Sequence, residues 1–285
     1  MGWVLRYASH LGYRSPDTPL FRESVGSLDP IAHIEFAAAL GFSGVQYALA
    51  RSRPLEEQEA VGKLLAKHRL ETGCLAYASF DRLTQPLWSS TATDARAILK
   101  NELSGAFETA KRINSKYLAV FGGNDARQPW SLQIAALIEN LVWAADLAER
   151  AGVILCLEPL NRNSVPNMLL HHIGDAYAVV KAVRSPSVRL IFDTGHVQAM
   201  DGDLLAHLDA TWDAIALVQI ADNPGRVEMG AGELNFDNIF RVLHAKGYRG
   251  LIELEHQWSR PGRETEQRGI DNLRRIDHAL SGDEK

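Results

Sequence analysis

The sequence predicts an α/β fold: a single (β/α)₈ barrel. Short apolar runs of strand length alternate with longer amphipathic stretches along the whole chain, a pattern typical of repeated strand–helix units around a parallel sheet. The 285 residues divide into eight such units of about 36 residues, close to a barrel of ~250 residues before insertions. Since no Pro/Gly/Ser-rich linker interrupts them, we expect residues 1–285 to form one domain. A doubly wound open sheet is the alternative.

Eight apolar runs are predicted strands, because each is short and bounded by breakers or polar residues. They are 3–8, 44–49, 72–78, 117–121, 153–157, 188–192, 215–220 and 251–255. Helical patterns follow them, at 30–40, 55–69, 94–113, 131–150, 174–183, 204–210, 236–246 and 264–280. The long segment 9–27 is predicted to be an enlarged loop after the first strand, on the face that carries the active site in barrels.

The helix ends carry local signals. Ser27 and Asp29 can cap the first helix, which starts at Pro30. Gly41 and Gly152 follow predicted helix ends, where a glycine commonly closes the last turn.

The composition favours a protein that acts on a small-molecule substrate. The chain has 30 Lys+Arg against 35 Asp+Glu, a net charge of −5, whereas nucleic-acid or anionic-membrane binding needs a basic face. No membrane-spanning segment or secretory signal is visible. Cys74 and Cys156 lie in apolar runs and are predicted to be reduced core residues. We therefore expect a cytoplasmic protein with a small-molecule substrate and neither nucleic acid nor membrane as partner.

Polar residues end four consecutive predicted strands: Glu158, Asp193, Gln219 and Glu255. They lie 35, 26 and 36 residues apart, each about one unit, so they should converge at the mouth of the barrel. One such carboxylate alone is often a helix cap or a loop salt bridge. Three carboxylates and an amide together would repel one another without a cation. Because all the ligands are oxygen atoms, we predict a divalent metal site for Mg²⁺ or Mn²⁺ rather than zinc.

Neighbouring residues suit substrate handling. His196, in Asp193-Thr-Gly-His, lies on a predicted turn that would aim its imidazole at the mouth. The alternative is a surface histidine at the start of a helix. Arg226 lies on a tight loop after the seventh strand and can hold a substrate carboxylate with a bidentate fork, or be a plain loop arginine. Glu253 faces the same side as Glu255 and is predicted to be an acid in the layer below it.

For several other histidine and tryptophan residues, the sequence leaves open whether they belong to the site. His171 and His172 follow the fifth strand and can be either site or loop residues. Trp88, Trp130 and Trp258 fall in loop-like stretches and are candidates for a wall of the site. Trp258 would also suit a subunit contact, so a homo-oligomer stays open.

These motifs resemble the xylose isomerase-like TIM barrels, and within them the hydroxypyruvate isomerases. The resemblance is dense over 152–255, and before residue 115 only the strand–helix rhythm agrees. It is carried by Glu158-Pro, Asp193-Thr-Gly-His, Val218-Gln-Ile-Ala-Asp, Pro224-Gly-Arg, Gly230-Ala-Gly-Glu-Leu-Asn-Phe and Gly247-Tyr-Arg-Gly-Leu-Ile-Glu-Leu-Glu. One departure is Ala119, where those isomerases tend to carry a histidine.

The resemblance implies a role for each strand-end residue. The metal would be held by the residues that match Glu158, Asp193, Gln219 and Glu255. The two glutamates would also act as acid and base, and His196 and Arg226 would contact substrate.

These groups suit proton transfer next to a carbonyl. A metal bound to the carbonyl and adjacent hydroxyl oxygens would stabilise the enediolate. Glu158 and Glu255 would then remove and return the proton. We expect a metal-dependent isomerase that interconverts a small 2-oxo-3-hydroxy acid and its aldehyde isomer, with Arg226 on the carboxylate.

Four alternative functions are compatible with the same barrel fold. A C3 epimerase of ketoses would use the same glutamates and metal, and a metal-dependent sugar or polyol dehydratase would lose water from the same enolate. A sugar-binding barrel without catalysis would bind no stoichiometric metal. A DNA-repair endonuclease would need a His-rich multi-zinc site and a basic groove, which the sequence does not predict.

Overall fold

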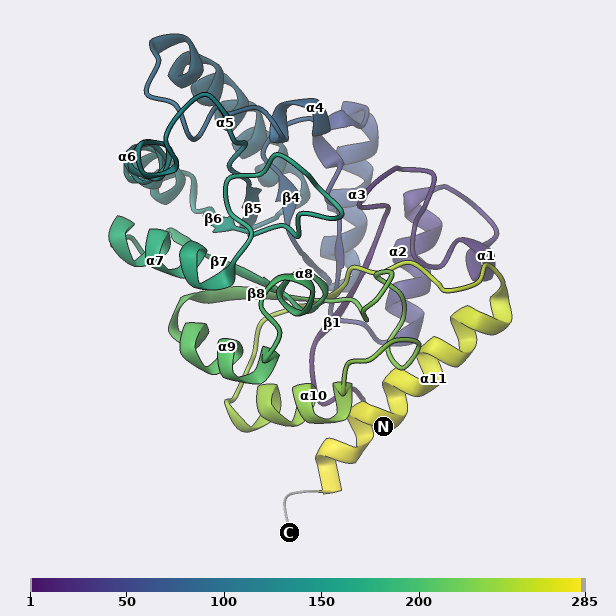
Figure 1. Cartoon of the computed structure of the whole chain (residues 1–285). Coiled ribbons are helices and arrows are strands. Elements are labelled where there is room, and N and C mark those ends of the chain that lie inside the picture. The colour runs from purple at the N-terminus through teal and green to yellow at the C-terminus, as the bar shows by residue number, and fades with distance from the viewer. Residues whose placement is uncertain (1, 283–285) are drawn as a thin grey trace.

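The computed structural model describes residues 2–282, so both ends of the predicted domain 1–285 lie outside the described residues. Parallel strands lie inside a ring of helices (Figure 1). The strands are β1 Tyr7–His10, β2 Gly44–Gln46, β3 Glu71–Thr72, β4 Leu75–Ala76, β5 Tyr117–Val120, β6 Ile154–Leu157, β7 Val188–Asp193, β8 Ile215–Ile220 and β9 Ile252–Leu254. Their order in the sheet is β3-β2-β1-β9-β8-β7-β6-β5-β4.

The sheet curls into a barrel because its two outermost strands are halves of one segment. β3 pairs with β2, β4 pairs with β5, and only two residues separate β3 from β4. Thr72 also forms a parallel bridge with Ser115, just before β5. The (β/α)₈ prediction is therefore confirmed, with the third predicted strand split in two, and the open doubly wound sheet is excluded.

The split has a physical cause at Gly73. A Cβ there would lie 1.8 Å from Glu253 Oε1, so no larger residue fits. The next amide, Cys74 N, donates to that carboxylate oxygen at 2.7 Å. A side chain from β9 thus replaces the regular strand pairing at this point.

Eight helices form the outer ring. They are α2 Pro30–Leu40, α3 Leu55–His68, α5 Thr93–Ile113, α6 Trp130–Ala151, α7 Ile173–Val183, α9 Leu204–Thr211, α10 Phe236–Ala245 and α11 Arg263–Ala279. They agree closely with the predicted ranges. Asp29 caps α2 through Ile31 N, and Gly41 and Gly152 close α2 and α6 with positive φ, as predicted.

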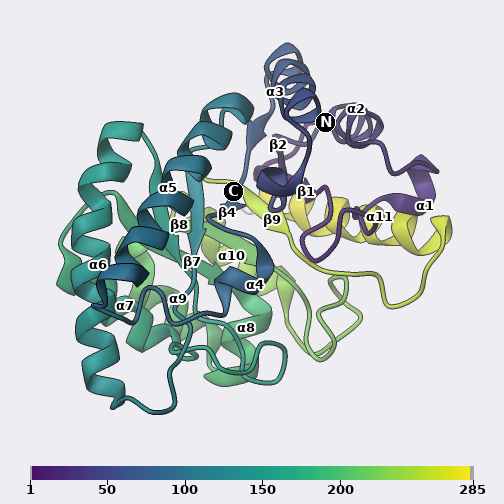
Figure 2. The ribbon, with the colours of Figure 1, turned by 90° about the horizontal axis from the view of Figure 1, so that it is seen from above.

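Further short helices were not predicted. They are α1 Arg22–Val25, α4 Phe80–Leu83, α8 Thr194–Met200 and the 3₁₀ turns Ala50–Ser52, Trp212–Ala214 and Leu280–Gly282. Figure 2 shows α4 and α8 with the long loops at one end of the barrel. This is the end at which the parallel strands finish.

The first strand starts later than predicted, at Tyr7 instead of residue 3. The Trp3 indole donates to Leu40 O, and the amides of Val4 and Leu5 donate to the Asp277 carboxylate. These groups bond to α2 and α11, so they are not available for the sheet.

Helix α6 is the one described helix that is long and apolar enough to cross a membrane by length and composition. In the barrel it contacts β6, α5 and α7, and Leu137, Leu141 and Ala144 are buried on its inner side. It is packed as an outer helix of the barrel. Cys74 and Cys156 are buried and free, as predicted.

Candidate active site

The four strand-end residues meet at one end of the barrel. Glu158 directly follows β6, Asp193 ends β7, Gln219 lies in β8, and Glu255 directly follows β9. Asp193 is level with Gln219, and Gln219 is level with Glu253 of β9. All are buried. The spacing of one strand–helix unit therefore places these side chains together, as the sequence predicts.

Arg226 lies between two of the carboxylates. Its Nη1 and Nη2 donate to the two oxygens of Asp193, each at 3.0 Å, and Nη2 donates to Glu255 Oε2 at 2.7 Å. The guanidinium is buried and offsets both negative charges. Its fork, predicted to hold a substrate carboxylate, is bidentate on Asp193 in this structure, while the residue also lines the cavity of the site.

Asp222 fixes the loop that presents Arg226. Its carboxylate accepts hydrogen bonds from the amides of Asn223, Gly230, Gly232 and Leu234, at 2.8–3.0 Å. Sequence reasoning did not single out Asp222. An aspartate at the head of a glycine-rich loop was the available signal.

His196 lies at a helix start, in the first turn of α8, but it is buried rather than on the surface. Asp193 caps this helix and accepts from His196 N at 2.8 Å. The ring Nδ1 accepts from Asn161 N at 3.1 Å, which leaves Nε2 as the protonated nitrogen, 3.6 Å from Glu158 Oε1. Burial, with Arg226 nearby, lowers the pKa of His196 to about 3. The histidine is therefore neutral, and its Nε2 lies near the Glu158 carboxylate without a hydrogen bond to it.

The carboxyl groups differ in their ionisation. Burial, reinforced by Glu255 and Asp193, raises the pKa of Glu158 well above its usual value. Burial also raises the pKa of Glu255 to about 8, although Arg226 opposes this. Burial acts on Asp193 too, but the Arg226 guanidinium and His196 bring its pKa below the usual value. Two protonatable glutamates thus lie beside an ionised aspartate, an arrangement suited to acid–base chemistry.

Gln219 and Glu253 form a layer beneath these groups. Gln219 Nε2 donates to Glu253 Oε2 at 2.8 Å, and Glu253 Oε1 accepts from Cys74 N. Burial raises the pKa of Glu253 to about 7. Gln219 Oε1 is buried without a hydrogen-bond partner, which is costly unless the atom is matched by a ligand.

These donors fit a divalent cation. One oxygen each of Glu158 and Asp193 and one ring nitrogen of His196 lie within 4.8 Å of one another. Gln219, level with Asp193 on the neighbouring strand, has a buried unpartnered oxygen of the kind that hard cations accept. A buried Glu/Asp/His group that could hold a metal ion is therefore present.

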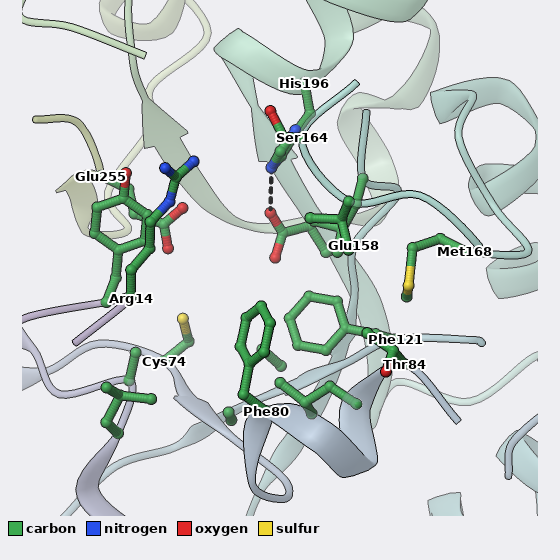
Figure 3. A pocket seen from close by; sticks show the side chains of 18 of the residues that line it. Arg14, Cys74, Phe80, Thr84, Phe121, Glu158, Ser164, Met168, His196 and Glu255 are labelled. Atoms are coloured by element: carbon green, nitrogen blue, oxygen red, sulfur yellow. Dashed lines mark ion pairs between the residues drawn. The ribbon is translucent and has the colours of Figure 1, made fainter. Parts of the chain in front are cut away.

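A cavity of about 360 Å³ opens over the site. Glu158, His196, Arg226 and Glu255 line it, whereas Asp193 and Gln219 do not. Figure 3 shows the carboxylates of Glu158 and Glu255 on one side and the rings of Phe80 and Phe121 on the other. Sequence reasoning missed Phe80 because α4 was not predicted, and Phe121 because it was assigned only to the end of the predicted strand 117–121.

Several candidates are not among the lining residues. His171 Nδ1 is 2.7 Å from Leu160 O, and His172 pairs with Asp201. The predicted tryptophan wall is wrong: Trp88 is fully buried, Trp130 is exposed, and Trp258 packs against Phe21 and Gly269. Trp258 is half-buried within the chain.

Fold and site together define a class: a (β/α)₈ barrel enzyme with an acid–base and metal-competent cluster at the carboxyl ends of its strands. The model of the xylose isomerase-like TIM barrel family matches residues 34–276. The chain belongs to this family.

Two curated relatives are isomerases. The hydroxypyruvate isomerase of Escherichia coli is 28% identical over 233 residues, which covers 81% of this chain and 89% of the relative. The 2-oxo-tetronate isomerase of Haemophilus influenzae is 29% identical over 228 residues, covering 78% and 86%. The prediction that this chain is an isomerase is confirmed.

Two solved structures show the same fold. A family 2 AP endonuclease from Brucella melitensis has a TM-score of 0.79 and 25% identity, covering 93% of this chain and 96% of that one. The D-psicose 3-epimerase of Clostridium cellulolyticum H10 has a TM-score of 0.73 and 18% identity, covering 98% and 97%. One barrel thus carries proteins named for different reactions.

Proposed function

We propose that this isomerase interconverts a small 2-oxo-3-hydroxy acid and its 2-hydroxy-3-oxo isomer by proton transfer, with Mg²⁺ or Mn²⁺ as its metal. The supporting observation is the pair Glu158 and Glu255, two buried glutamates with raised pKa values that line one cavity beside the ionised Asp193. The names of the two curated relatives agree with this substrate class.

The two glutamates exchange the proton. An ionised glutamate removes the proton from the carbon beside the carbonyl, and the opposite, protonated one returns a proton at the neighbouring carbon. Burial raises the pKa of both carboxyl groups above the usual value for glutamate, which moves proton uptake and release toward neutral pH. Gln46 Nε2, 2.7 Å from Glu255 Oε1, and Arg226 orient the Glu255 carboxylate.

Other residues hold the metal and orient the substrate. Glu158, Asp193, Gln219 and Glu255 would hold the ion, which when bound supplies a Lewis acid for the substrate's oxygens. The Nε2–H of His196 faces the cavity beside Glu158 and is the donor for a substrate oxygen. Arg226, which also lines the cavity, is the sequence-predicted contact for the substrate carboxylate.

The test uses Glu158→Gln and Glu255→Gln in the full chain loaded with Mn²⁺. Each should lower kcat by about 10²–10⁴-fold, the range for loss of a general acid or base. Glu149→Gln, on the exposed side of α6, is the control and should keep kcat. The proposal fails if both active-site variants keep wild-type turnover on every isomerase substrate that the parent accepts.

Product analysis separates the related reactions. Proton NMR in D₂O should show one deuterium in the isomer of hydroxypyruvate or of a 2-oxo-tetronate. Exchange on a ketohexose with inversion at C3 would indicate an epimerase instead, and a dehydrated product would indicate a dehydratase. Removal of divalent ions should abolish turnover, and Mn²⁺ should restore it.

A further inference from the structure

The cavity is strongly apolar opposite the reacting groups. Phe80 and Phe121 lie across it from the carboxylates of Glu158 and Glu255 (Figure 3). The large apolar side chains that line the cavity include Leu49, Phe80, Leu83, Phe121, Val165 and Met168. We call these six side chains the apolar wall.

The apolar wall is held in place by several elements. Gly123 approaches the chain after α4 so closely that a Cβ there would lie 2.3 Å from Thr84 O. Ser89 Oγ donates to Gly123 O, and Gly123 forms an antiparallel bridge with Met168. The loops after β4, β5 and β6 are therefore joined to one another behind the cavity.

Phe80 is 58% exposed. A large apolar side chain left exposed beside a cavity gains from covering by an apolar ligand group, because that covering removes both surfaces from water. The apolar wall therefore has exposed apolar surface that a ligand group could cover.

Polyhydroxylated substrates match this wall poorly. Across the loops after β4, β5 and β6, the lining hydroxyl side chains are those of Thr84 and Ser164. A chain of sugar hydroxyls against the wall would lose hydrogen bonds to water without replacement, which is unfavourable.

The volume of the cavity also indicates a substrate larger than a three-carbon acid. At about 360 Å³ it lies within the range of ~300–1,000 Å³ found for sites of drug-sized ligands. A three-carbon acid is far smaller than such a ligand and would leave the apolar wall uncovered.

We propose that the substrate is a 2-oxo-3-hydroxy acid whose C3 carries an apolar group of about the size of a benzyl ring, and that this group packs against the apolar wall. The inference rests on the proposed function and specifies its substrate. The C3–H bond breaks and a C2–H bond forms, the hydroxyl proton moves from O3 to O2, and the carbonyl moves from C2 to C3. No oxidant or reductant is needed.

The experiment compares three acids on the Mn²⁺-loaded full chain: hydroxypyruvate, the acid with benzyl at C3, and the acid with a trihydroxypropyl chain at C3. We expect kcat/KM for the benzyl acid to exceed that for the hydroxylated acid by about 100-fold. The apolar wall favours the benzyl group, whereas the hydroxyl groups would lose their hydrogen bonds to water without replacement. Equal or higher kcat/KM for the hydroxylated acid overturns the inference.

Variants locate the effect on the wall. Phe80→Ala should lower the ratio of the two kcat/KM values by about tenfold. Leu132→Ala removes another exposed apolar side chain, on α6 and outside the cavity lining, and should leave the ratio unchanged. An unchanged ratio in Phe80→Ala counts against the wall as the binding surface.

A binding measurement separates this inference from the proposed function. If none of the three acids is turned over, the proposed reaction fails, and calorimetric titration with 2-hydroxy-4-phenylbutanoate and with glycerate then tests the wall alone. Tighter binding of the phenyl compound by tenfold or more supports an apolar substituent. Equal affinities overturn it.

Discussion

The two halves of the barrel mouth have opposite chemistry. Strands β6, β7 and β9 lead to Glu158, Asp193 and Glu255, whereas the cavity lining near β4 and β5 begins with Ala76 and Ala119. The charged half is held by hydrogen bonds and ion pairs, and the apolar half by packed loops. In the function proposed above, the charged half performs proton transfer and the apolar half selects the substrate.

The largest expected effect in the charged half is that of Arg226→Met. It leaves Asp193 and Glu255 buried without their cation, so the free energy of unfolding should fall by about 3–5 kcal/mol. Urea denaturation without divalent ions measures this. Mn²⁺ should then raise the Tm of the variant more than that of the parent, because the ion replaces the lost charge.

Arg275→Met is the matched control for that loss. Arg275 pairs with Asp237 at the surface, and breaking an exposed pair should cost no more than about 1 kcal/mol. Equal urea midpoints for the two variants would show that Arg226 does not stabilise the charged half.

The layer beneath the site is tested by Glu253→Gln. One oxygen of Glu253 accepts from Cys74 N and the other from Gln219 Nε2, so an amide places a donor against a donor. Gln219 should turn its oxygen toward residue 253 and away from the metal site. Mn²⁺ affinity, measured by calorimetry, should fall about 10–100-fold.

Glu228→Gln is the control for metal binding, since Glu228 accepts from Ser259 outside the charged half. An unchanged Mn²⁺ affinity in Glu253→Gln would mean that the carboxylate of Glu253 does not orient Gln219.

Ala119→His introduces into the apolar half the histidine that the resembling isomerases tend to carry. Ala119 is buried and lines the cavity, so an imidazole there takes apolar space. The kcat/KM for the benzyl-substituted acid should fall about tenfold relative to that for hydroxypyruvate. Ala119→Ser, a much smaller change, should move this ratio less; a larger shift in the serine variant would argue against a size effect.

Arg14→Met should have the smallest effect. Arg14 lines the cavity together with Arg226, and its guanidinium is 5.4 Å from the Tyr13 ring centroid. As an exposed cation it should contribute modestly to holding a substrate carboxylate, so KM should rise about fivefold with kcat nearly unchanged. A drop in kcat with constant KM would contradict this role, and Arg22→Met, outside the cavity lining, is the control.

Most of the barrel was predictable because its signals are local. Helix 30–40 follows from the cap at Asp29 and the glycine at 41, and both signals work within one turn. The strand positions of Glu158 and Asp193 follow from apolar runs that end in a charge. The start of β1 was wrong because Trp3, Val4 and Leu5 bond to Leu40 and Asp277, far away in the sequence.

Within the site, the sequence predicted which residues converge but not how they pair. The bidentate contact of Arg226 with Asp193 joins residues 33 positions apart. His196 was predicted to lie on a turn, with a helix start as the alternative, since Thr194-Gly-His has weak helix propensity; the helix start is what forms, as α8 with Asp193 as its cap. The tryptophan wall was wrong because loop position alone does not fix the direction of a side chain.

The sequence by itself determined the eight-unit barrel and the strand-end residues Glu158, Asp193, Gln219 and Glu255, because hydrophobic periodicity and unit length are properties of the chain. The tertiary structure decided that Arg226 lies between Asp193 and Glu255 and that Gln219 donates a hydrogen bond to Glu253. It also placed Phe80 and Phe121 across the cavity from Glu158 and Glu255. These contacts join side chains from distant strands and loops, whose relative positions exist only when the barrel is closed.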